Sequence, residues 1–215
     1  MIKCCIFDLD GTLIDSLADL GETVNQLLKE QKQNPYPIEA YRMMVGDGVK
    51  MLLKRAFPQA NEAELCSLKK RFDRLYRANC FQNTLPYPGI CEVLNHLQKQ
   101  HIQLAVLSNK PDSFAKEICS HFFGDELFFA VTGQKDNQPK KPSPEGAEEI
   151  IRCCGCTKEQ VLFIGDSNVD IFTAQNAGIA SCGVLWGFRS EEELIAAGAD
   201  FLISHPRELT TLLSK

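Results

Sequence analysis

The chain opens with an apolar run that ends in two carboxylates and a glycine, in the stretch Ile6-Phe7-Asp8-Leu9-Asp10-Gly11-Thr12-Leu13-Ile14-Asp15-Ser16. Residues two apart in a strand face the same side, so Asp8 and Asp10 should lie close together where the strand gives way to a loop. Two adjacent carboxylates repel each other, and a buried strand does not tolerate them unpaired. A divalent cation such as Mg²⁺ would resolve this conflict, because it prefers hard oxygen ligands. The alternative is an ordinary turn containing Asp and Gly that merely ends the strand.

The composition is that of a globular protein and limits the classes of partner. The 215 residues are 44% hydrophobic and 24% charged, which suits one large domain or one domain with an insertion. A net charge of -5 argues against general binding to nucleic acid or to an acidic membrane, which favours a basic surface. No apolar run approaches the roughly 20 residues of a membrane span, and no secretory signal precedes the first strand. We therefore expect a cytoplasmic protein.

Ten cysteines are many for a chain of this length. Without an export signal, we expect reduced thiols rather than a framework of disulfides. Cys153 and Cys156 have the C-x-x-C spacing of some metal sites, but a structural zinc ion needs four ligands and no second pair of suitable spacing is present. The sequence leaves open whether any cysteine has a function.

From about residue 85 onward, short apolar runs alternate with segments of helical spacing. The expected strands are 102–107, 127–131, 161–164, 180–185 and 201–203, and the expected helices lie near 114–122, 144–153 and 168–176. Nearly continuous apolar strands that alternate with helices favour a parallel sheet covered on both faces. The first strand, 3–7, should join this sheet. The predicted fold class is therefore α/β, with a doubly wound, Rossmann-like core.

Residues 16–82 look different, because their apolar residues recur at helical spacing. Three such faces are Leu17, Leu20, Val24, Leu27 and Leu28; Val49, Leu52, Leu53, Ala56 and Phe57; and Leu65, Leu68, Phe72, Leu75 and Tyr76. Asn34-Pro35-Tyr36-Pro37 separates the first helix from the next. We predict an α-helical cap domain over 16–82, inserted into a core domain made of 1–15 and 83–215. Such an insertion overhangs the edge where α/β sheets bind ligands and could act as a lid, although a purely structural helical pack is the alternative.

Polar side chains follow four of the expected strands. They are Asp8 and Asp10; Ser108, Asn109 and Lys110; Lys140, Lys141 and Ser143; and Asp166, Ser167, Asn168 and Asp170. In a parallel sheet the carboxyl ends of the strands share one edge, so the four groups should converge. Carboxylates could hold Mg²⁺ and supply a nucleophile and an acid/base, while a hydroxyl, backbone N–H groups and a lysine could bind phosphate oxygens. Together these groups suit phosphoryl transfer. Taken one at a time, each has an ordinary structural alternative: Ser108 could cap a helix, Lys141 could be a solvated lysine, and Asp166 could lie in a turn.

Four sequence motifs resemble those of the haloacid dehalogenase superfamily. They are DLDGTLIDS at 8–16, SNK at 108–110, KPSP at 141–144 and GDSNVD at 165–170. The resemblance covers the predicted core domain from end to end, and a helical insertion between the first and second motifs is the family's common cap arrangement. The resemblance implies that Asp8 is a nucleophile that forms an aspartyl-phosphate. It also implies that Asp10 protonates the leaving oxygen and then activates water.

The same resemblance implies ligand sets for a metal and for the transferred phosphoryl group. Mg²⁺ would be held by Asp8, the backbone carbonyl of Asp10 and Asp166, with Asp170 in support. The phosphoryl group would be bound by Thr12, Ser108, Asn109 through its backbone, and Lys141. Lys140 is an adjacent rival, but the Lys-Pro-x-Pro register favours Lys141.

The resemblance also narrows the reaction. Aspartate at position 10 fits the phosphatases and phosphomutases of the superfamily, because members with a long-lived aspartyl-phosphate carry threonine there and dehalogenases lack this acid/base. The segment 41–49 and the sequence at 108–111 resemble phosphoglycolate phosphatases, and Gly46 and Gly48 would let this loop approach a small ligand closely. Lys50 or Arg42 could meet a substrate carboxylate. We therefore expect a Mg²⁺-dependent hydrolase of a small phosphate monoester.

Other functions stay open at this point. A β-phosphoglucomutase-like phosphomutase, a pyrophosphatase or a nucleotidase would use the same core. A signalling receiver domain also brings together acidic residues, a hydroxyl and a lysine on a parallel sheet, but it lacks a helical insertion after the first strand and is roughly half as long. A catalytically silent phosphate-binding protein is a third class, against which the intact motif set argues. The exact substrate and the oligomeric state do not follow from the sequence.

Overall fold

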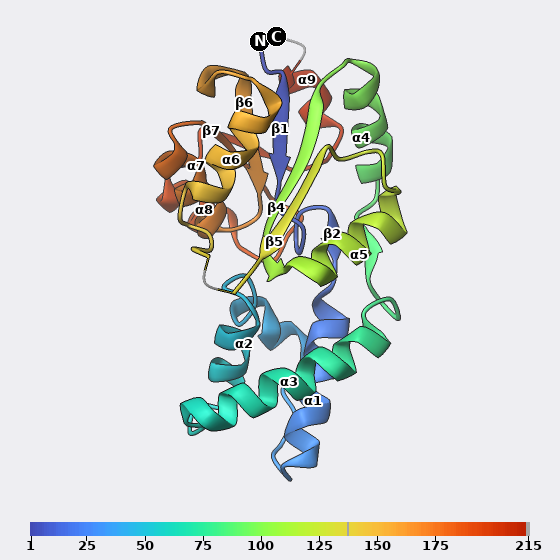
Figure 1. Cartoon of the computed structure of the whole chain (residues 1–215), viewed down its shortest axis with the longest axis vertical. Helices are drawn as coiled ribbons and strands as arrows, with labels where there is room; N and C mark the ends of the chain where they lie inside the picture. Colours follow the sequence, from blue (N-terminus) through green and yellow to red (C-terminus); the bar gives the residue numbers. More distant parts are fainter. Residues whose placement is uncertain (137, 214–215) are drawn as a thin grey trace.

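The structure, a computed structural model, describes residues 1–136 and 138–213, and its main feature is a parallel sheet in the order β5-β4-β1-β6-β7-β8 (Figure 1). The strands are β1 (Cys4–Phe7), β4 (Gln103–Pro111), β5 (Ala130–Gln134), β6 (Val161–Gly165), β7 (Ala180–Val184) and β8 (Phe201–Ile203). β1 lies in the middle and pairs with both β4 and β6, so that Phe7 is opposite Val106 on one side and Ile164 on the other. The carboxyl ends of these three strands therefore meet at one edge.

Helices cover both faces of this sheet. They are α4 (Ile90–Lys99), α5 (Asp112–Phe123), α6 (Glu145–Cys154), α7 (Asn168–Ala177), α8 (Glu191–Ala197) and α9 (Glu208–Leu213), with a 3-10 turn η2 at Lys158–Gln160. Alternate residues of β1 point to opposite faces: Cys5 and Phe7 pack with residues of α4, α5 and α9, while Ile6 packs with residues of α6 and α7. The predicted doubly wound α/β fold is confirmed. None of the described helices is both long and apolar enough to cross a membrane.

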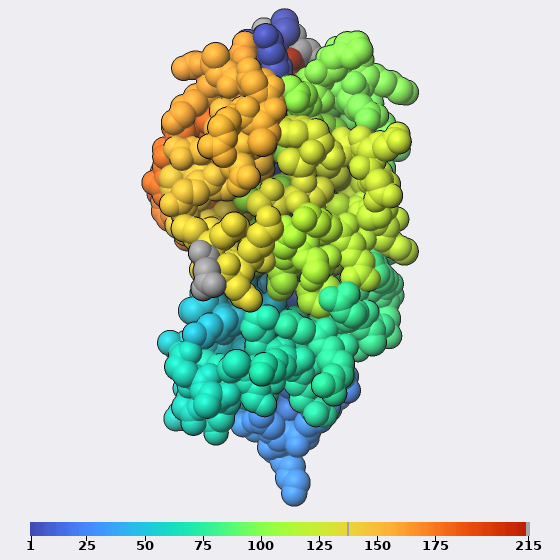
Figure 2. All heavy atoms as spheres, in the orientation of Figure 1, coloured from blue at the N-terminus to red at the C-terminus, as the bar shows by residue number. Residues whose placement is uncertain are grey.

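A second group of helices lies beyond the carboxyl ends of the strands. It comprises α1 (Leu17–Glu30), η1 (Ile38–Met43), α2 (Val49–Ala56) and α3 (Glu62–Asn79), which form the lower part of the molecule in Figure 1. Their apolar faces make a cluster of their own, to which Phe114 and Phe188 of the sheet-bearing part also contribute. Figure 2 shows the two parts closely apposed along their junction. The expected helical insertion is thus present, while its division from the core at 16–82 stays a prediction.

Two adjacent segments connect the sheet-bearing part to the helical part, and the buried side chain of Asp19 links them by hydrogen bonds. Its carboxylate accepts hydrogen bonds from the backbone N–H groups of Asn83 and Thr84, and from the Thr84 hydroxyl at 2.6 Å. Beside it, β2 (Ile14–Asp15) and β3 (Leu85–Pro86) form an antiparallel pair. These contacts fix the place where the helical part leaves the edge of the sheet.

Two strands differ from their predicted ranges by more than one residue, for physical reasons. The strand expected over 127–131 begins only at Ala130, because the apolar run before it includes Phe128, whose side chain is buried in the core without strand pairing. Conversely, β4 was expected to end at 107 but continues through the polar residues Ser108, Asn109 and Lys110, each 5% exposed. Apolar character indicates burial rather than backbone pairing. Polar side chains can stay in a buried strand when they have hydrogen-bond partners, as Asn109 has with Gly46 and Lys110 has with Asp10.

Candidate active site

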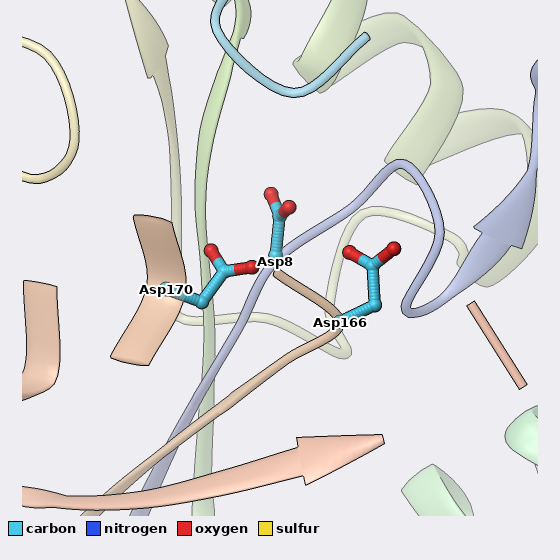
Figure 3. A group of neighbouring side chains, drawn as sticks. All are labelled: Asp8, Asp166 and Asp170. Carbon is cyan, nitrogen blue, oxygen red and sulfur yellow. The ribbon is translucent and has the colours of Figure 1, made fainter. Parts of the chain in front are cut away.

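Three buried carboxylates meet at the carboxyl edge of the sheet. Asp8 follows β1, Asp166 follows β6, and Asp170 lies in the first turn of α7. One oxygen from each lies within 4.8 Å of the other two, and Figure 3 shows the carboxyl groups side by side. Among the residues that the structure describes, this is the one such group of potential metal ligands.

Close backbone packing allows these carboxylates to approach. The Asp8 amide donates to the Ile164 carbonyl at 2.9 Å, which continues the pairing of β1 with β6. A Cβ atom at Gly165 would lie 2.3 Å from the Asp170 side chain, and one at Gly11 would lie 2.3 Å from the Asp166 carboxylate. Glycine is therefore required at both positions, and at Gly11 a φ of +87° adds a second reason.

Lys141 is the cation of this cluster. Its Nζ lies 2.8 Å from Asp8 Oδ1 and 2.6 Å from Asp170 Oδ1, and its side chain is 2% exposed. Burial by itself favours the neutral amine, but Asp170 and Asp8 outweigh this effect and raise the pKa of Lys141 to about 12. Lys140 instead is exposed and reaches out to the Asp47 carbonyl. The structure therefore brings Lys141, and not Lys140, to the carboxylates.

The cluster has an excess of negative charge, because one lysine faces three carboxylates. Burial raises the pKa of Asp8 to about 6, with Lys141 opposing this change and Asp170 adding to it. Burial, together with Asp170 and Asp8, also raises the pKa of Asp166 well above its usual range. The buried Oδ1 of Asp8 has its ion pair with Lys141 but no well-oriented hydrogen bond. Hard oxygen donors that lack positive charge are a suitable environment for a divalent cation such as Mg²⁺.

Two further neighbours hold Asp166. The Phe188 amide donates to its Oδ2 at 2.7 Å, and the Thr12 hydroxyl lies 3.5 Å from its Oδ1. Thr12 is fully buried, so its contact in the structure is with this carboxylate rather than with open space. The predicted contact of Thr12 with a phosphoryl group stays a prediction.

Asn109 connects the site to the helical part. Its side-chain amide donates to the Gly46 carbonyl at 3.0 Å and to the Lys141 carbonyl at 3.1 Å, and it accepts from the Lys141 amide at 2.9 Å. The Asn109 side chain thus holds the Lys141 backbone, whereas the sequence suggested only a role for its own backbone. Ser108 is 5% exposed and lines the same cleft as Asp8.

Asp10 lies apart from the three clustered carboxylates. Its Oδ1 accepts from the Ser16 hydroxyl at 2.5 Å, and its two oxygens lie 3.0 and 3.1 Å from Lys110 Nζ. Lys110 belongs to the polar group predicted to follow the strand 102–107, and its sequence position alone indicated no role for it. The spacing of Ser108 and Lys110, two residues apart in one strand, was a signal that their side chains face the same side.

A narrow cleft lies between the sheet edge and the helical part. Asp8, Asp10 and Ser108 line one side of it, together with Gly46 and Gly48 from the loop before α2. The other lining residues are mainly apolar, among them Leu20, Val45, Val49, Leu52, Phe72 and Phe114. Lys50 and Arg42 are not lining residues: Lys50 pairs with exposed Glu62, and Arg42 pairs with Glu39 and donates to the Gly187 carbonyl.

A family model for haloacid dehalogenase-like hydrolases matches residues 5–184, a range that contains all four motifs. The chain belongs to the haloacid dehalogenase-like hydrolase family. The resemblance inferred from the motifs is therefore confirmed, and so is the fold that it implied.

Several proteins similar to this chain have a named activity. A phosphoglycolate phosphatase of Haemophilus influenzae is 32% identical over 215 residues, with 96% of each chain covered. Another from Pseudomonas putida is 31% identical over 213 residues, covering 96% of this chain and 78% of the relative. The crystal structure of a predicted phosphoglycolate phosphatase from Haemophilus somnus has a TM-score of 0.92 at 29% identity, covering 99% of this chain and 98% of that one. These similarities confirm the expected enzyme class, a phosphatase that hydrolyses phosphoric monoesters.

Proposed function

We propose that this protein is a Mg²⁺-dependent phosphatase that hydrolyses a small phosphate monoester through an aspartyl-phosphate on Asp8. The observation that carries the proposal is the placement of Asp8 at the cleft, 2.8 Å from Lys141 and within 4.8 Å of the carboxylates of Asp166 and Asp170. A carboxylate that faces a cleft beside a buried cation is suited to attack phosphorus, because the same cation can bind the phosphoryl oxygens.

The donor set also supports the choice of metal. Asp8 and Asp166, with the backbone carbonyl of Asp10, would hold Mg²⁺, and Asp170 would support it. When bound, Mg²⁺ would neutralise negative charge on the phosphate and so favour attack by a carboxylate. Burial raises the pKa of Asp8 to about 6, and a bound divalent cation would favour its ionised form.

The first half-reaction would transfer the phosphoryl group to the protein. An oxygen of the Asp8 carboxylate forms a bond to phosphorus, and the bond between phosphorus and the ester oxygen breaks. The departing oxygen takes a proton from the carboxyl group of Asp10. Lys141, the Ser108 hydroxyl and the Asn109 backbone N–H would stabilise the charge on the phosphoryl oxygens during this transfer.

The second half-reaction would release phosphate. A water oxygen attacks phosphorus, the Asp10 carboxylate accepts a proton from this water, and the bond between the Asp8 oxygen and phosphorus breaks. Asp8 is thereby restored as a carboxylate. We further propose that residues 16–82 act as a cap domain over the core, because their helices provide most of the apolar wall of the cleft. Exclusion of bulk water by such a wall protects the reaction from side reactions.

The first substrate to test is 2-phosphoglycolate. Support comes from the phosphoglycolate phosphatases that are about 30% identical over nearly the whole chain. The loop with Gly46 and Gly48 lines the cleft, where glycine leaves room for a compact substrate. The second candidate, a phosphomutase, would use the same carboxylates and is distinguished by its product, an isomerised sugar phosphate.

The test is a panel of phosphate esters assayed for released phosphate, with 2-phosphoglycolate, sugar phosphates, a nucleoside monophosphate and pyrophosphate. We expect multiple turnovers with a small monoester in Mg²⁺, loss of activity in EDTA, and recovery when Mg²⁺ is restored in excess. Isomerisation of a sugar phosphate without net release of phosphate would favour the phosphomutase. Full activity in EDTA would remove the metal from the proposal.

A further inference from the structure

Asp10 is held by a lysine that is also bound to the helical part of the molecule. Lys110, at the end of β4, places its Nζ 3.0 and 3.1 Å from the two oxygens of Asp10. The same Nζ lies 2.8 Å from the hydroxyl of Tyr76, which comes from α3. The Lys110 side chain is 3% exposed, so these contacts form away from water. Resting on the proposed function, we infer that Lys110 is a positioning residue that fixes the Asp10 carboxylate and links its orientation to the place of α3.

The donors of Lys110 are fully used. An ammonium group has three N–H donors and no acceptor, and Lys110 has three acceptor oxygens within 3.1 Å, two from Asp10 and one from Tyr76. No donor is left for an anionic group of a substrate. Although Lys110 lines the cleft, it therefore acts on the reaction through Asp10 rather than by binding the substrate.

Ring packing holds the Tyr76 side chain, and with it the link between Lys110 and α3, in place. The Tyr76 ring stacks on Phe72 at a centroid distance of 5.4 Å and meets Phe114 edge-on at 5.2 Å. Lys110 Nζ also lies 4.6 Å from the centre of the Tyr76 ring, a distance at which the ring attracts the cation. Because the ring is packed on two sides, the position of its hydroxyl follows the position of α3.

A second link reaches Asp10 from the start of the helical part. The Ser16 hydroxyl donates to Asp10 Oδ1 at 2.5 Å, and Ser16 immediately precedes α1. Asp10 is thus held by Lys110 on one side and by the first of the two connecting segments on the other. Lys110 contacts α3 through the Tyr76 hydroxyl and Ser16 adjoins α1, so the orientation of this acid/base is linked to the position of the helical part.

With p-nitrophenyl phosphate as the substrate, Lys110 should assist the second half-reaction more than the first. Its leaving group departs without a proton, so formation of the aspartyl-phosphate needs little help from Asp10. Hydrolysis of the aspartyl-phosphate still needs Asp10 aimed at water, and a misplaced base slows that step. Loss of Lys110 should therefore make the phosphorylated enzyme accumulate.

The experiment is rapid-mixing kinetics of Lys110→Met with p-nitrophenyl phosphate. We expect kcat to fall about 10- to 100-fold and KM to fall with it, so that kcat/KM changes by less than about threefold. We also expect a burst of p-nitrophenol close to one equivalent per active site. An unchanged kcat without a burst would overturn the inference, as would a raised KM at constant kcat, since that pattern indicates a substrate-binding residue.

Two further variants separate positioning from stability. Tyr76→Phe keeps the packed ring and removes only the hydroxyl, and we expect a smaller fall in kcat with a partial burst; wild-type kinetics would refute the link to α3. Lys116→Met removes an exposed lysine that pairs with Asp112 at 2.8 Å on α5, and it should match the wild type. A wild-type enzyme that hydrolyses no phosphate ester would refute the proposed function itself, whereas an active wild type with an unaffected Lys110→Met would refute only this inference.

Discussion

Lys141 Nζ lies 2.8 Å from Asp8 Oδ1, with both residues almost completely buried. The same ammonium group lies 2.6 Å from Asp170. Lys141, in the segment before α6, therefore contacts both the residue that follows β1 and the first turn of α7. Buried charges are tolerated only when they are paired, so the buried carboxylates require a cation here, and the proposed reaction requires the same positive charge beside Asp8, which lines the cleft. The two requirements can be separated by substitution.

Lys141→Met should abolish activity and also destabilise the protein. Removal of the lysine leaves Asp8 and Asp170 close together without a cation, and breaking a buried pair in this way costs about 3–5 kcal/mol. We expect a loss of this order in the free energy of unfolding, measured by urea denaturation in EDTA. Lys140→Met is the matched control, because Lys140 is exposed and should cost less than about 1 kcal/mol.

A double variant tests the cause of that loss. Asp170→Asn in the Lys141→Met background removes one of the two unpaired carboxylates, so part of the lost free energy of unfolding should return while activity stays absent. If the second substitution instead destabilises the protein further by its full single-variant amount, repulsion between Asp8 and Asp170 is not the reason for the loss.

Asp8→Asn should remove turnover while the fold is kept. The amide is no nucleophile, so kcat should fall by at least about 10³-fold, in the range expected when a nucleophilic group is lost. Lys141 keeps Asp170 as a partner, and the thermal unfolding midpoint should therefore stay within a few degrees of that of the wild type. Phosphate release assays and thermal denaturation check the two parts, and substantial residual turnover would contradict the nucleophilic role of Asp8.

The sequence predicted the sheet and the carboxylate cluster because both follow from short-range rules. Apolar runs identified β1 and β6 nearly to the residue, and a parallel sheet must bring the groups after these strands to one edge. The prediction of a strand over 127–131 was misplaced, because an apolar run indicates burial and not strand pairing. Phe128 is buried but precedes the paired residues of β5.

The contacts of Asp10 could not be predicted from the sequence. Its partner Lys110 was visible in the SNK motif, but the Tyr76 hydroxyl that completes the contact comes from the far end of an amphipathic helix. Helical spacing predicts that Tyr76 is buried and says nothing about the atom that its hydroxyl meets. In the same way, the sequence shows Arg42 and Lys50 as cations near the loop that contains Gly46 and Gly48, but only tertiary contacts place them outside the cleft.

The raised pKa values of Asp8 and Asp166 predict how stability depends on pH without metal. The folded protein binds protons at these two carboxyl groups more tightly than the unfolded chain does. Protonation of the groups therefore stabilises the folded state, and this contribution is fully present below the ordinary carboxyl pKa of about 4. For Asp8 this contribution is lost as the pH rises through about 6. Mg²⁺ competes with protons for the same oxygens, so it should stabilise the protein near neutral pH and hardly at all near pH 4.

The measurement is thermal unfolding in EDTA and in excess Mg²⁺ across this pH range. Saturating metal at neutral pH should raise the unfolding midpoint by about 5 °C or more. The shift should decline as the pH falls through about 6, the pKa of Asp8. In Asp166→Asn the shift should be much smaller at every pH, because one ligand is lost. A Mg²⁺ shift of equal size in that variant would place the ion elsewhere.

Gly48→Ala should impair activity beyond its effect on stability. Gly48 has a φ of +84°, and a Cβ there would lie 3.2 Å from the Asn109 carbonyl at the edge of the cleft. The side chain would strain the backbone by about 1–3 kcal/mol and push the loop away from Asn109. We expect kcat/KM to fall about tenfold, as for a displaced positioning contact.

Gly155→Ala is the matched control, since Gly155 also has a positive φ, +68°, but nothing lies within 4 Å of its Cβ position. It lies at the end of α6, and alanine there should lower the free energy of unfolding by about 1–2 kcal/mol while kcat/KM keeps the wild-type value. Comparing the two variants separates backbone strain from displacement of the loop. Equal losses of kcat/KM in both would mean that stability alone controls activity, and would refute a specific role for Gly48 at the cleft.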